Sequence, residues 1–258
     1  PRNSVQRNAH NIQTGSFIES DPKYPGVLFN TTCLIGPEGI LTKYRKVNPW
    51  IPWEVHASPH DVPGYTEELF PVAQTELGNL GCAICYDWLF PETIRQLTLN
   101  GGEVLIRISA YMDPWGATPP MDWWTVVNRC RALENLAYVV ATNQGASMQH
   151  YGPFSWPGGS MVVDYDGRIL AQADPGSGEK IVVAEIDLEA LRAARAQRFG
   201  HNPLAHLRRE AYARPAACGY PVASFSTAKD AAGNRTVEEN NAAIGAVLQQ
   251  NPYSGRTR

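Results

Sequence analysis

The sequence predicts an α/β (α+β) protein in which helices cover one mixed sheet or two stacked sheets. Strand–helix–strand order is expected over residues 80–108, whereas antiparallel hairpins are expected over residues 28–44 and 160–172. That mixture is typical of a mixed sheet with helical layers. The 258 residues are 43% hydrophobic and 18% charged, a composition that argues against intrinsic disorder.

The N-terminal part is expected to form strands, one hairpin and one long loop. Strand patterns occupy residues 13–18, 28–35 and 40–44, and a Gly-Pro-Glu-Gly turn at 36–39 joins the last two as a hairpin. Residues 48–65 then form a loop rich in proline and tryptophan. Long irregular loops inside compact domains are often functional.

The middle of the chain is expected to alternate strands and helices. Residues 80–85 predict a strand, and residues 91–100 predict a helix with Pro91 in its first turn. A further strand is expected over residues 103–108, and an aromatic loop over residues 111–120.

A second helix is expected over residues 123–136, with Asp122 as its N-cap. Apolar residues recur along it at helical spacing, and this spacing predicts the face that packs on the core. These residues are Val126, Val127, Cys130, Leu133 and Ala137.

A β-meander and a last helix are expected next. The strands are predicted over residues 138–142, 160–164, 168–172 and 180–186, and the helix over residues 188–197.

The pattern divides the chain into a domain over residues 1–213 and a tail over residues 214–258. The tail is rich in alanine, glycine, asparagine and proline, and it predicts at most one short helix, over residues 237–249. Such a tail has too few apolar residues for a core of its own, so we expect it to lie on a partner subunit of a homo-oligomer.

Composition excludes several classes of function. The formal net charge of −3 argues against a nucleic-acid-binding surface, and no apolar run approaches the ~18 residues of a membrane helix. The five cysteines are sparse and odd in number, which indicates a reducing, cytoplasmic setting rather than a disulfide framework. The scattered histidines lack metal-ligand spacing, so we expect neither a metal nor a cofactor.

Cys85 is the candidate nucleophile. It follows the apolar strand residues 81–84 and precedes a helix, so backbone N–H groups of the turn and the helix N-terminus would favour its thiolate and hold an oxyanion. The alternative is a buried core cysteine. A redox pair with Cys82 is a weaker alternative, because residues three apart on a strand point to opposite faces.

Lys46 and Glu54 complete the candidate site. Lys46 lies where a strand enters the Trp/Pro loop, and Glu54 follows eight residues later. Lys46 alone would be an ordinary exposed lysine at a strand end with little core packing. A lysine, a carboxylate and a thiol at neighbouring strand ends together indicate nucleophilic catalysis.

These motifs together resemble the nitrilase superfamily of carbon–nitrogen hydrolases. Residues 43–46 (KYRK) look like its lysine motif, and residues 85–92 (CYDWLFPE) look like its cysteine motif. Residues 131–144 are similar to the helix–strand unit that follows, and the resemblance extends over about residues 13–210. Residues 46–54 and 107–114 are similar to the aliphatic amidase and formamidase branch.

The resemblance implies an αββα sandwich that dimerises across helices. It implies Cys85 as nucleophile, Lys46 as the cation that stabilises the tetrahedral intermediate, and Glu54 as a second glutamate that positions the substrate or the lysine. The family's general-base glutamate is assigned to neither Glu19 nor Glu38. We expect that glutamate upstream of residue 1, in an N-terminal portion of the family domain that this sequence lacks.

The implied reaction is hydrolysis of a carboxamide to an acid and ammonia through a cysteine thioester, with a small amide as the partner molecule. Aromatic side chains are expected to wall its pocket, although each of them could instead serve packing. These candidates for substrate binding are Tyr86, Trp50, Trp53, Tyr111 and Trp88. The alternatives are a nitrilase, an N-carbamoyl amidohydrolase with the same triad, and a non-catalytic fragment or family member.

Overall fold

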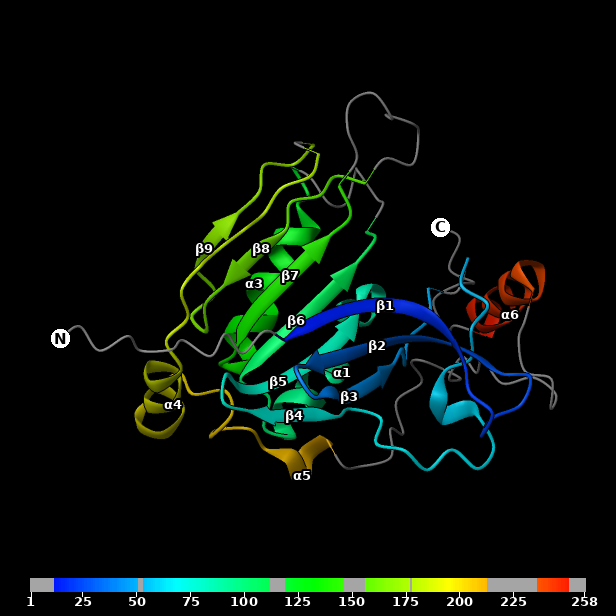
Figure 1. Ribbon diagram of the computed structural model, residues 1–258, viewed down its shortest axis with the longest axis horizontal. Coiled ribbons are helices and arrows are strands. Elements are labelled where there is room, and N and C mark those ends of the chain that lie inside the picture. The colour runs from blue at the N-terminus through cyan, green and yellow to red at the C-terminus, as the bar shows by residue number, and fades with distance from the viewer. Residues whose placement is uncertain are drawn as a thin grey trace.

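The strands of the described residues form two sheets, which lie one in front of the other in Figure 1. The computed structural model describes residues 12–50, 53–111, 119–145, 156–176, 178–212 and 236–250. Sheet A is antiparallel, with its strands in sequence order. Its strands are β1 (Gln13–Ser20), β2 (Leu28–Gly36) and β3 (Gly39–Arg45). The predicted hairpin is therefore confirmed.

Sheet B is the mixed sheet that the sequence predicts. Its strands run in the order β4-β5-β6-β7-β8-β9, and the three central strands β5, β6 and β7 are parallel. The outer pairs are antiparallel. The strands are β4 (Val72–Thr75), β5 (Gly78–Ile84), β6 (Val104–Ser109), β7 (Tyr138–Asn143), β8 (Met161–Val163) and β9 (Ile169–Gln172).

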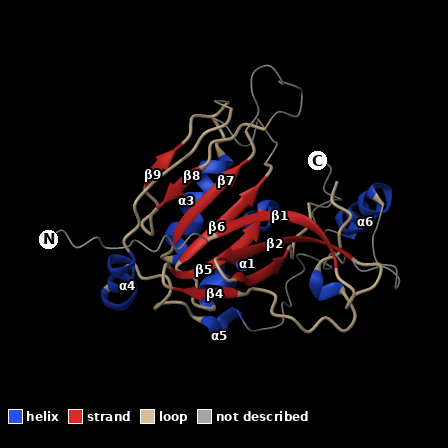
Figure 2. Cartoon of the chain, viewed as in Figure 1, coloured by secondary structure: helices blue, strands red, loops and turns tan. Residues whose placement is uncertain are grey.

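The helices of the described residues are shown in Figure 2. They are α1 (Pro91–Leu99), α3 (Trp123–Asn135), α4 (Leu188–Gln197), α5 (Arg209–Tyr212) and α6 (Val237–Gln250), with 3-10 turns η1 (Pro59–Asp61) and η2 (Cys85–Leu89). Helix α6 matches the short helix that the sequence predicts in the tail. In the described part of the chain, no helix has the length and apolar character needed to cross a membrane.

The core has two layers, one on each face of sheet B. Helices α1 and α3 pack on one face, where Leu97 and Ala132 join Ala83 and Leu105 in a buried cluster. On the other face, Cys82 packs with residues of sheet A such as Leu34. The described residues thus form a helix–sheet–sheet arrangement, and the second helical layer of an αββα sandwich stays a prediction.

The predicted packing face of the second helix is confirmed only for Val127 and Ala137, which pack on the core. Val126 and Leu133 are 57% and 50% exposed, and Cys130 is exposed as well. Besides Trp124 and Ala132, the helix buries polar residues such as Asn128 and Arg131, because hydrogen bonds to the turn and strands beneath it satisfy them. Asp122 occupies the N-cap position, but it has a φ of 49° and its side chain makes no capping hydrogen bond.

The predicted strand over residues 180–186 is also wrong. Sheet B ends at β9, and residues 178–186 contain no strand. Ile181 and Val183 are 91% and 80% exposed. A run of β-branched apolar residues suits a strand, but it forms one only where a neighbouring strand and a core face are available.

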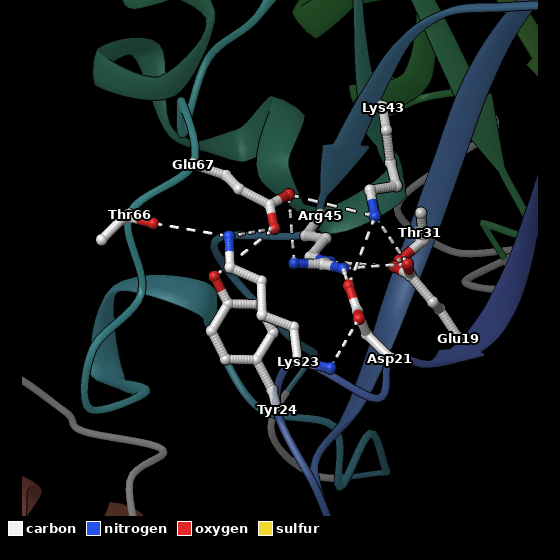
Figure 3. Close-up of polar contacts among 9 residues, drawn as sticks. All are labelled: Glu19, Asp21, Lys23, Tyr24, Thr31, Lys43, Arg45, Thr66 and Glu67. Carbon is white, nitrogen blue, oxygen red and sulfur yellow. Dashed lines mark hydrogen bonds and ion pairs between the residues drawn. The ribbon is translucent and has the colours of Figure 1, made fainter.

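A cluster of charged side chains covers the outer face of sheet A (Figure 3). Arg45 is 2% exposed, donates two hydrogen bonds of 2.8 Å to Glu19, and pairs with Asp21 and Glu67. Lys43 Nζ lies 2.7 Å from Glu19. Burial raises the pKa of Glu19, but hydrogen bonds from Arg45, Lys43 and Thr31 outweigh it and lower that pKa to about 2. The cluster ties β1 to β3 across β2.

We predict that Glu19→Gln lowers the free energy of unfolding by about 1–2 kcal/mol at pH 7, because buried Arg45 loses a charged acceptor. The folded-state pKa of Glu19 lies below its ordinary value of 4.5. Its stabilisation is therefore present above about pH 4.5 and is lost as the pH falls toward 2, so the variant should show a flatter pH dependence there.

Urea unfolding between pH 7 and pH 3 measures this effect. Glu38→Gln is the matched control, because Glu38 is exposed in the turn of the same sheet. Equal destabilisation by the two substitutions would contradict the structural role of the cluster.

Candidate functional site

Cys85 occupies a tight corner between a strand and a helical turn. β5 ends at Ile84, and Cys85 opens η2 with a φ of 47°. A non-glycine residue in this left-handed region costs on the order of 1–3 kcal/mol, and such residues cluster at active sites. Cys85 is partly exposed. The sequence-based placement at the end of the strand is confirmed to within one residue.

The carboxylate of Asp87 holds this corner against the end of β3. Asp87 is fully buried and accepts hydrogen bonds from Ile84 N at 3.1 Å, Asn48 N at 2.8 Å and Asn48 Nδ2 at 3.1 Å. Burial raises the pKa of Asp87, and the charge of Lys46 and these hydrogen bonds oppose that rise. The segment that follows β3 is thereby fixed beside the turn that carries Cys85.

Lys46 and Glu54 form an ion pair in which the lysine is buried and the glutamate is partly exposed. Lys46 is 1% exposed, and its Nζ lies 2.6 Å from Glu54 Oε2. Glu54 also accepts a hydrogen bond of 2.8 Å from Asn30 Nδ2 and one from the backbone N–H of Trp50. Burial raises the pKa of Glu54, but the Lys46 charge and these hydrogen bonds outweigh it and hold the pKa below its ordinary value. The expectation that Lys46 has little packing is therefore wrong.

The structure brings the Lys46–Glu54 pair to the Cys85 corner. The positive charge of Lys46 acts on both residues that follow Cys85, because it opposes the rise in the pKa of Tyr86 and of Asp87. Alternation along β3 directs Tyr44 and Lys46 toward sheet B, whereas Lys43 and Arg45 point to the outer cluster.

The aromatic candidates fall into two groups. Tyr86 and Tyr111 are half-buried beside the corner, and Trp50 and Trp53 lie together on the loop with ring centroids 6.4 Å apart. Trp88 is fully buried, and its indole donates a hydrogen bond of 3.2 Å to the carbonyl of Ala83. This position favours the packing role that the sequence left open for Trp88. Residues 112–118 of the aromatic loop lie outside the described residues.

Arg107 and His56 were not predicted as site residues. Arg107 is buried beneath the Cys85 corner, and its guanidinium lies 4.2 Å from the ring centroid of Trp124. A basic residue within the otherwise apolar strand β6 was the available signal. His56 interacts electrostatically with Glu54 and Lys46, and burial lowers its pKa. No sequence pattern distinguished His56 from the other histidines.

Neither Glu19 nor Glu38 belongs to this site. The Glu19 carboxylate is held by Arg45, Lys43 and Thr31 on the outer face of sheet A, opposite Lys46. Glu38 lies exposed in the turn between β2 and β3. Both carboxylates lie away from Cys85, so neither of them is assigned the role of general base.

The other described thiols have environments unlike that of Cys85. Cys82 is 1% exposed within hydrogen-bonding distance of Thr14 and Thr32, and burial raises its pKa to about 11. Burial also raises the pKa of Cys33 and Cys130. Cys82 points between the sheets, which disfavours a redox pair with Cys85. No group of three or more metal-ligating residues occurs in the described part of the chain.

Comparison with known protein families identifies the chain. Residues 2–196 match the model of the carbon-nitrogen hydrolases. The chain belongs to this family, within the nitrilase superfamily. It is 35% identical over 183 residues to a formamidase from Bacillus cereus strain B4264, a match that covers 70% of the chain and 50% of the relative. The chain thus spans half the length of the curated relatives it matches.

Solved structures show the same fold as this carbon-nitrogen hydrolase. A carbon-nitrogen hydrolase from Helicobacter pylori G27 matches with a TM-score of 0.60 and 26% identity, covering 79% of this chain and 70% of that one. A variant of an amidase from Nesterenkonia sp. AN1 matches with a TM-score of 0.56 and 20% identity, covering 78% of this chain and 66% of that one.

We predict that iodoacetamide at neutral pH alkylates Cys85 before the other thiols. Cys85 is partly exposed at a strained corner, whereas a raised pKa disfavours the thiolate of Cys33, Cys82 and Cys130. Mass spectrometry of partially labelled protein locates the modified residue. Faster labelling of Cys33 or Cys130 would contradict the assignment of Cys85.

Proposed function

We propose that the chain carries the catalytic site of an amidase, which hydrolyses a small carboxamide to an acid and ammonia through a thioester on Cys85. One observation supports this proposal above the others. The Lys46–Glu54 ion pair is fixed beside the strained Cys85 corner by the hydrogen bonds of Asp87. A thiol, a cation and a carboxylate held at one corner suit acyl transfer.

In the proposed mechanism the Cys85 thiolate attacks the carbonyl carbon, and the carbonyl oxygen becomes an oxyanion. Lys46 and the backbone N–H of Tyr86 stabilise this oxyanion, and loss of one such donor typically reduces the rate by ~10²–10³. Glu54 remains ionised, as its lowered pKa favours, and it orients the Lys46 ammonium. Its role in the proposal is positioning.

The C–N bond then breaks, and the nitrogen leaves as ammonia after it receives a proton. Water attacks the thioester, the acid is released, and Cys85 regains its thiolate. Both steps require a general acid–base group. The family resemblance implies a further glutamate for this role, and we assign the role to no residue described here. Thiolate attack and proton transfer suffice for the reaction, so no cofactor enters the proposal.

The substrate class rests on the relatives. The matched Bacillus cereus protein is named a formamidase, and the Nesterenkonia structure is described as carrying the acetamide moiety of fluoroacetamide on its active-site cysteine. Short aliphatic amides are therefore the proposed substrates. Ammonia release from formamide and acetamide, compared with short nitriles and N-carbamoyl amino acids, tests this proposal. Preference for a nitrile or a carbamoyl compound would favour those alternatives, and failure of Cys85 to form a thioester with any of these substrates would favour a non-catalytic member.

Lys46 should be required for acylation, whereas Lys43 should not. Lys46→Ala removes the oxyanion-stabilising charge, and we expect the rate of thioester formation to fall by about 10²-fold or more. Lys43 is 29% exposed on the opposite face of β3, so Lys43→Ala should leave the rate within about twofold. Rapid quench and mass spectrometry of the acyl-enzyme measure both rates.

Stability needs a separate control, because Lys46→Ala leaves the partly buried Glu54 carboxylate without its cation, and breaking a fully buried pair costs about 3–5 kcal/mol. Lys46→Arg keeps the charge and the pairing, but its planar fork cannot place the charge where a compact ammonium does. We therefore expect Lys46→Arg to fold and to acylate slowly. Similar acylation by Lys46→Arg and the parent would refute the role of Lys46.

We also propose that the protein is a homo-oligomer with α3 in its interface. The outer face of α3 exposes Trp123, Val126 and Leu133, and a row of apolar residues on a helix is suited to burial against a second copy. The family resemblance implies dimers across helices, which supports the same face.

Val126→Glu should therefore weaken self-association by at least about tenfold, because it places a charge in an apolar interface. Light scattering over a concentration series measures the mass. Ile40→Glu is the control, because Ile40 is 66% exposed on sheet A, away from α3. A parent protein that stays monomeric at micromolar concentration would exclude the oligomer.

A further inference from the structure

Arg107 is a buried cation directly beneath the Cys85 corner. It is 1% exposed on β6, on the face of sheet B that α1 and α3 cover. Its guanidinium lies 4.2 Å from the ring centroid of Trp124 and 5.6 Å from that of Trp88. Aromatic faces on two sides position the guanidinium and shield it from water.

The hydrogen bonds of Arg107 join three elements around the corner. Nη1 donates to Asn128 Oδ1 of α3 at 2.8 Å, and Nε donates to Ser109 Oγ at 3.1 Å. Nη2 donates to the carbonyl oxygen of Cys85 at 3.5 Å, a long contact that reaches the residue with left-handed geometry.

The charge of Arg107 has no carboxylate partner in the described part of the chain, because none of the ion pairs there includes it. Burial lowers its pKa to about 10, so the side chain is still protonated at neutral pH. Burying a cation without a negative partner is unfavourable in free energy, so a nearby group that becomes negatively charged would stabilise Arg107. A negatively charged Cys85 favours the protonated form of Arg107.

We propose that Arg107 is a positioning residue for Cys85. Its guanidinium binds the backbone carbonyl of Cys85 from the side of sheet B that α1 and α3 cover, and its positive charge stabilises the Cys85 thiolate. This inference rests on the proposed role of Cys85 as nucleophile. It assigns the two cations of the site to opposite sides of the corner. Lys46 faces the corner from the end of β3 and stabilises the oxyanion, whereas Arg107 lies below it and stabilises the nucleophile before attack.

Other charged and titratable groups face the same corner, and the experiment must separate them. Lys46 and its partner Glu54 approach from the β3 side, and Asp87 lies within η2. The phenols of Tyr86 and Tyr111 lie beside the corner. Arg131 on α3 also acts on Arg107, but it is paired with Glu134 at 2.7 Å.

The experiment measures the rate of Cys85 alkylation by iodoacetamide from pH 5 to pH 10, site by site, by mass spectrometry. Arg107→Met removes both the positive charge and the hydrogen-bonding guanidinium group. We expect its alkylation at pH 7 to be at least about tenfold slower and its midpoint to lie about one pH unit higher, as loss of an adjacent cation produces. Arg107→Lys keeps the positive charge but loses the planar guanidinium. The pH midpoint of Cys85 alkylation should therefore stay near that of the parent, while the limiting rate at high pH falls.

The matched control is Arg195→Met. Arg195 is a half-buried arginine, and it donates to the backbone carbonyls of Leu136 and Gly102, remote from Cys85. A merely structural arginine would lower stability without moving the alkylation midpoint. If Arg107→Met does not fold, Asn128→Ala offers a milder test, because it removes the 2.8 Å acceptor that holds the guanidinium and should slow alkylation severalfold.

The outcomes separate this inference from the proposed function. Rapid Cys85 alkylation in the parent with an unchanged midpoint in Arg107→Met would overturn the role of Arg107 and leave Cys85 as nucleophile. Equal shifts in Arg107→Met and Arg195→Met would overturn it as well. Slow alkylation of Cys85 in the parent, relative to Cys33 and Cys130, would overturn the proposed function itself.

Discussion

The buried carboxylate of Asp87 determines how the two halves of the site meet. It accepts hydrogen bonds from Ile84 N, at the end of β5, and from Asn48, just after β3. Those two segments belong to different sheets, so one side chain fixes the end of β3 against the end of β5, where Lys46 and Cys85 lie. A carboxylate with no exposed surface is unfavourable unless such donors surround it, and two of the donors here are backbone N–H groups held in place by the chain.

The alternation of side chains along β3 places its basic residues on opposite faces, so they do not compete for the same carboxylates. Lys43 and Arg45 point outward and are neutralised by Glu19, Asp21 and Glu67 on the outer face of sheet A. Lys46 points inward, where Glu54 is its carboxylate partner. One strand therefore supplies a structural ion cluster and a candidate catalytic cation without crossed pairings, because period-2 geometry places them on opposite faces.

The elements with strong local signals could be predicted from the sequence, including the β2–β3 hairpin, the parallel core of sheet B and the strand end at Cys85. The packing face of α3 could be predicted only in part, because it combines apolar residues such as Ala132 with polar ones that hydrogen-bond to distant parts of the chain, such as Arg131 to the carbonyl of Trp88. Helical periodicity of apolar residues does not reveal such buried polar positions. The strand predicted around Ile181 does not form for a related reason, since a local run of apolar residues does not specify a pairing partner.

The candidate site shows the same division. Cys85, Lys46 and Glu54 lie in local motifs and could be named from the sequence, whereas Arg107 acts through contacts with η2 and α3 that no local pattern reveals. Burying a cation against aromatic rings instead of a carboxylate preserves its charge for a neighbour that is only transiently negative. A permanent carboxylate in that position would neutralise Arg107 and leave the thiolate without support. The aromatic rings around Arg107 therefore contribute to the electrostatics of the Cys85 corner, as the charged groups do.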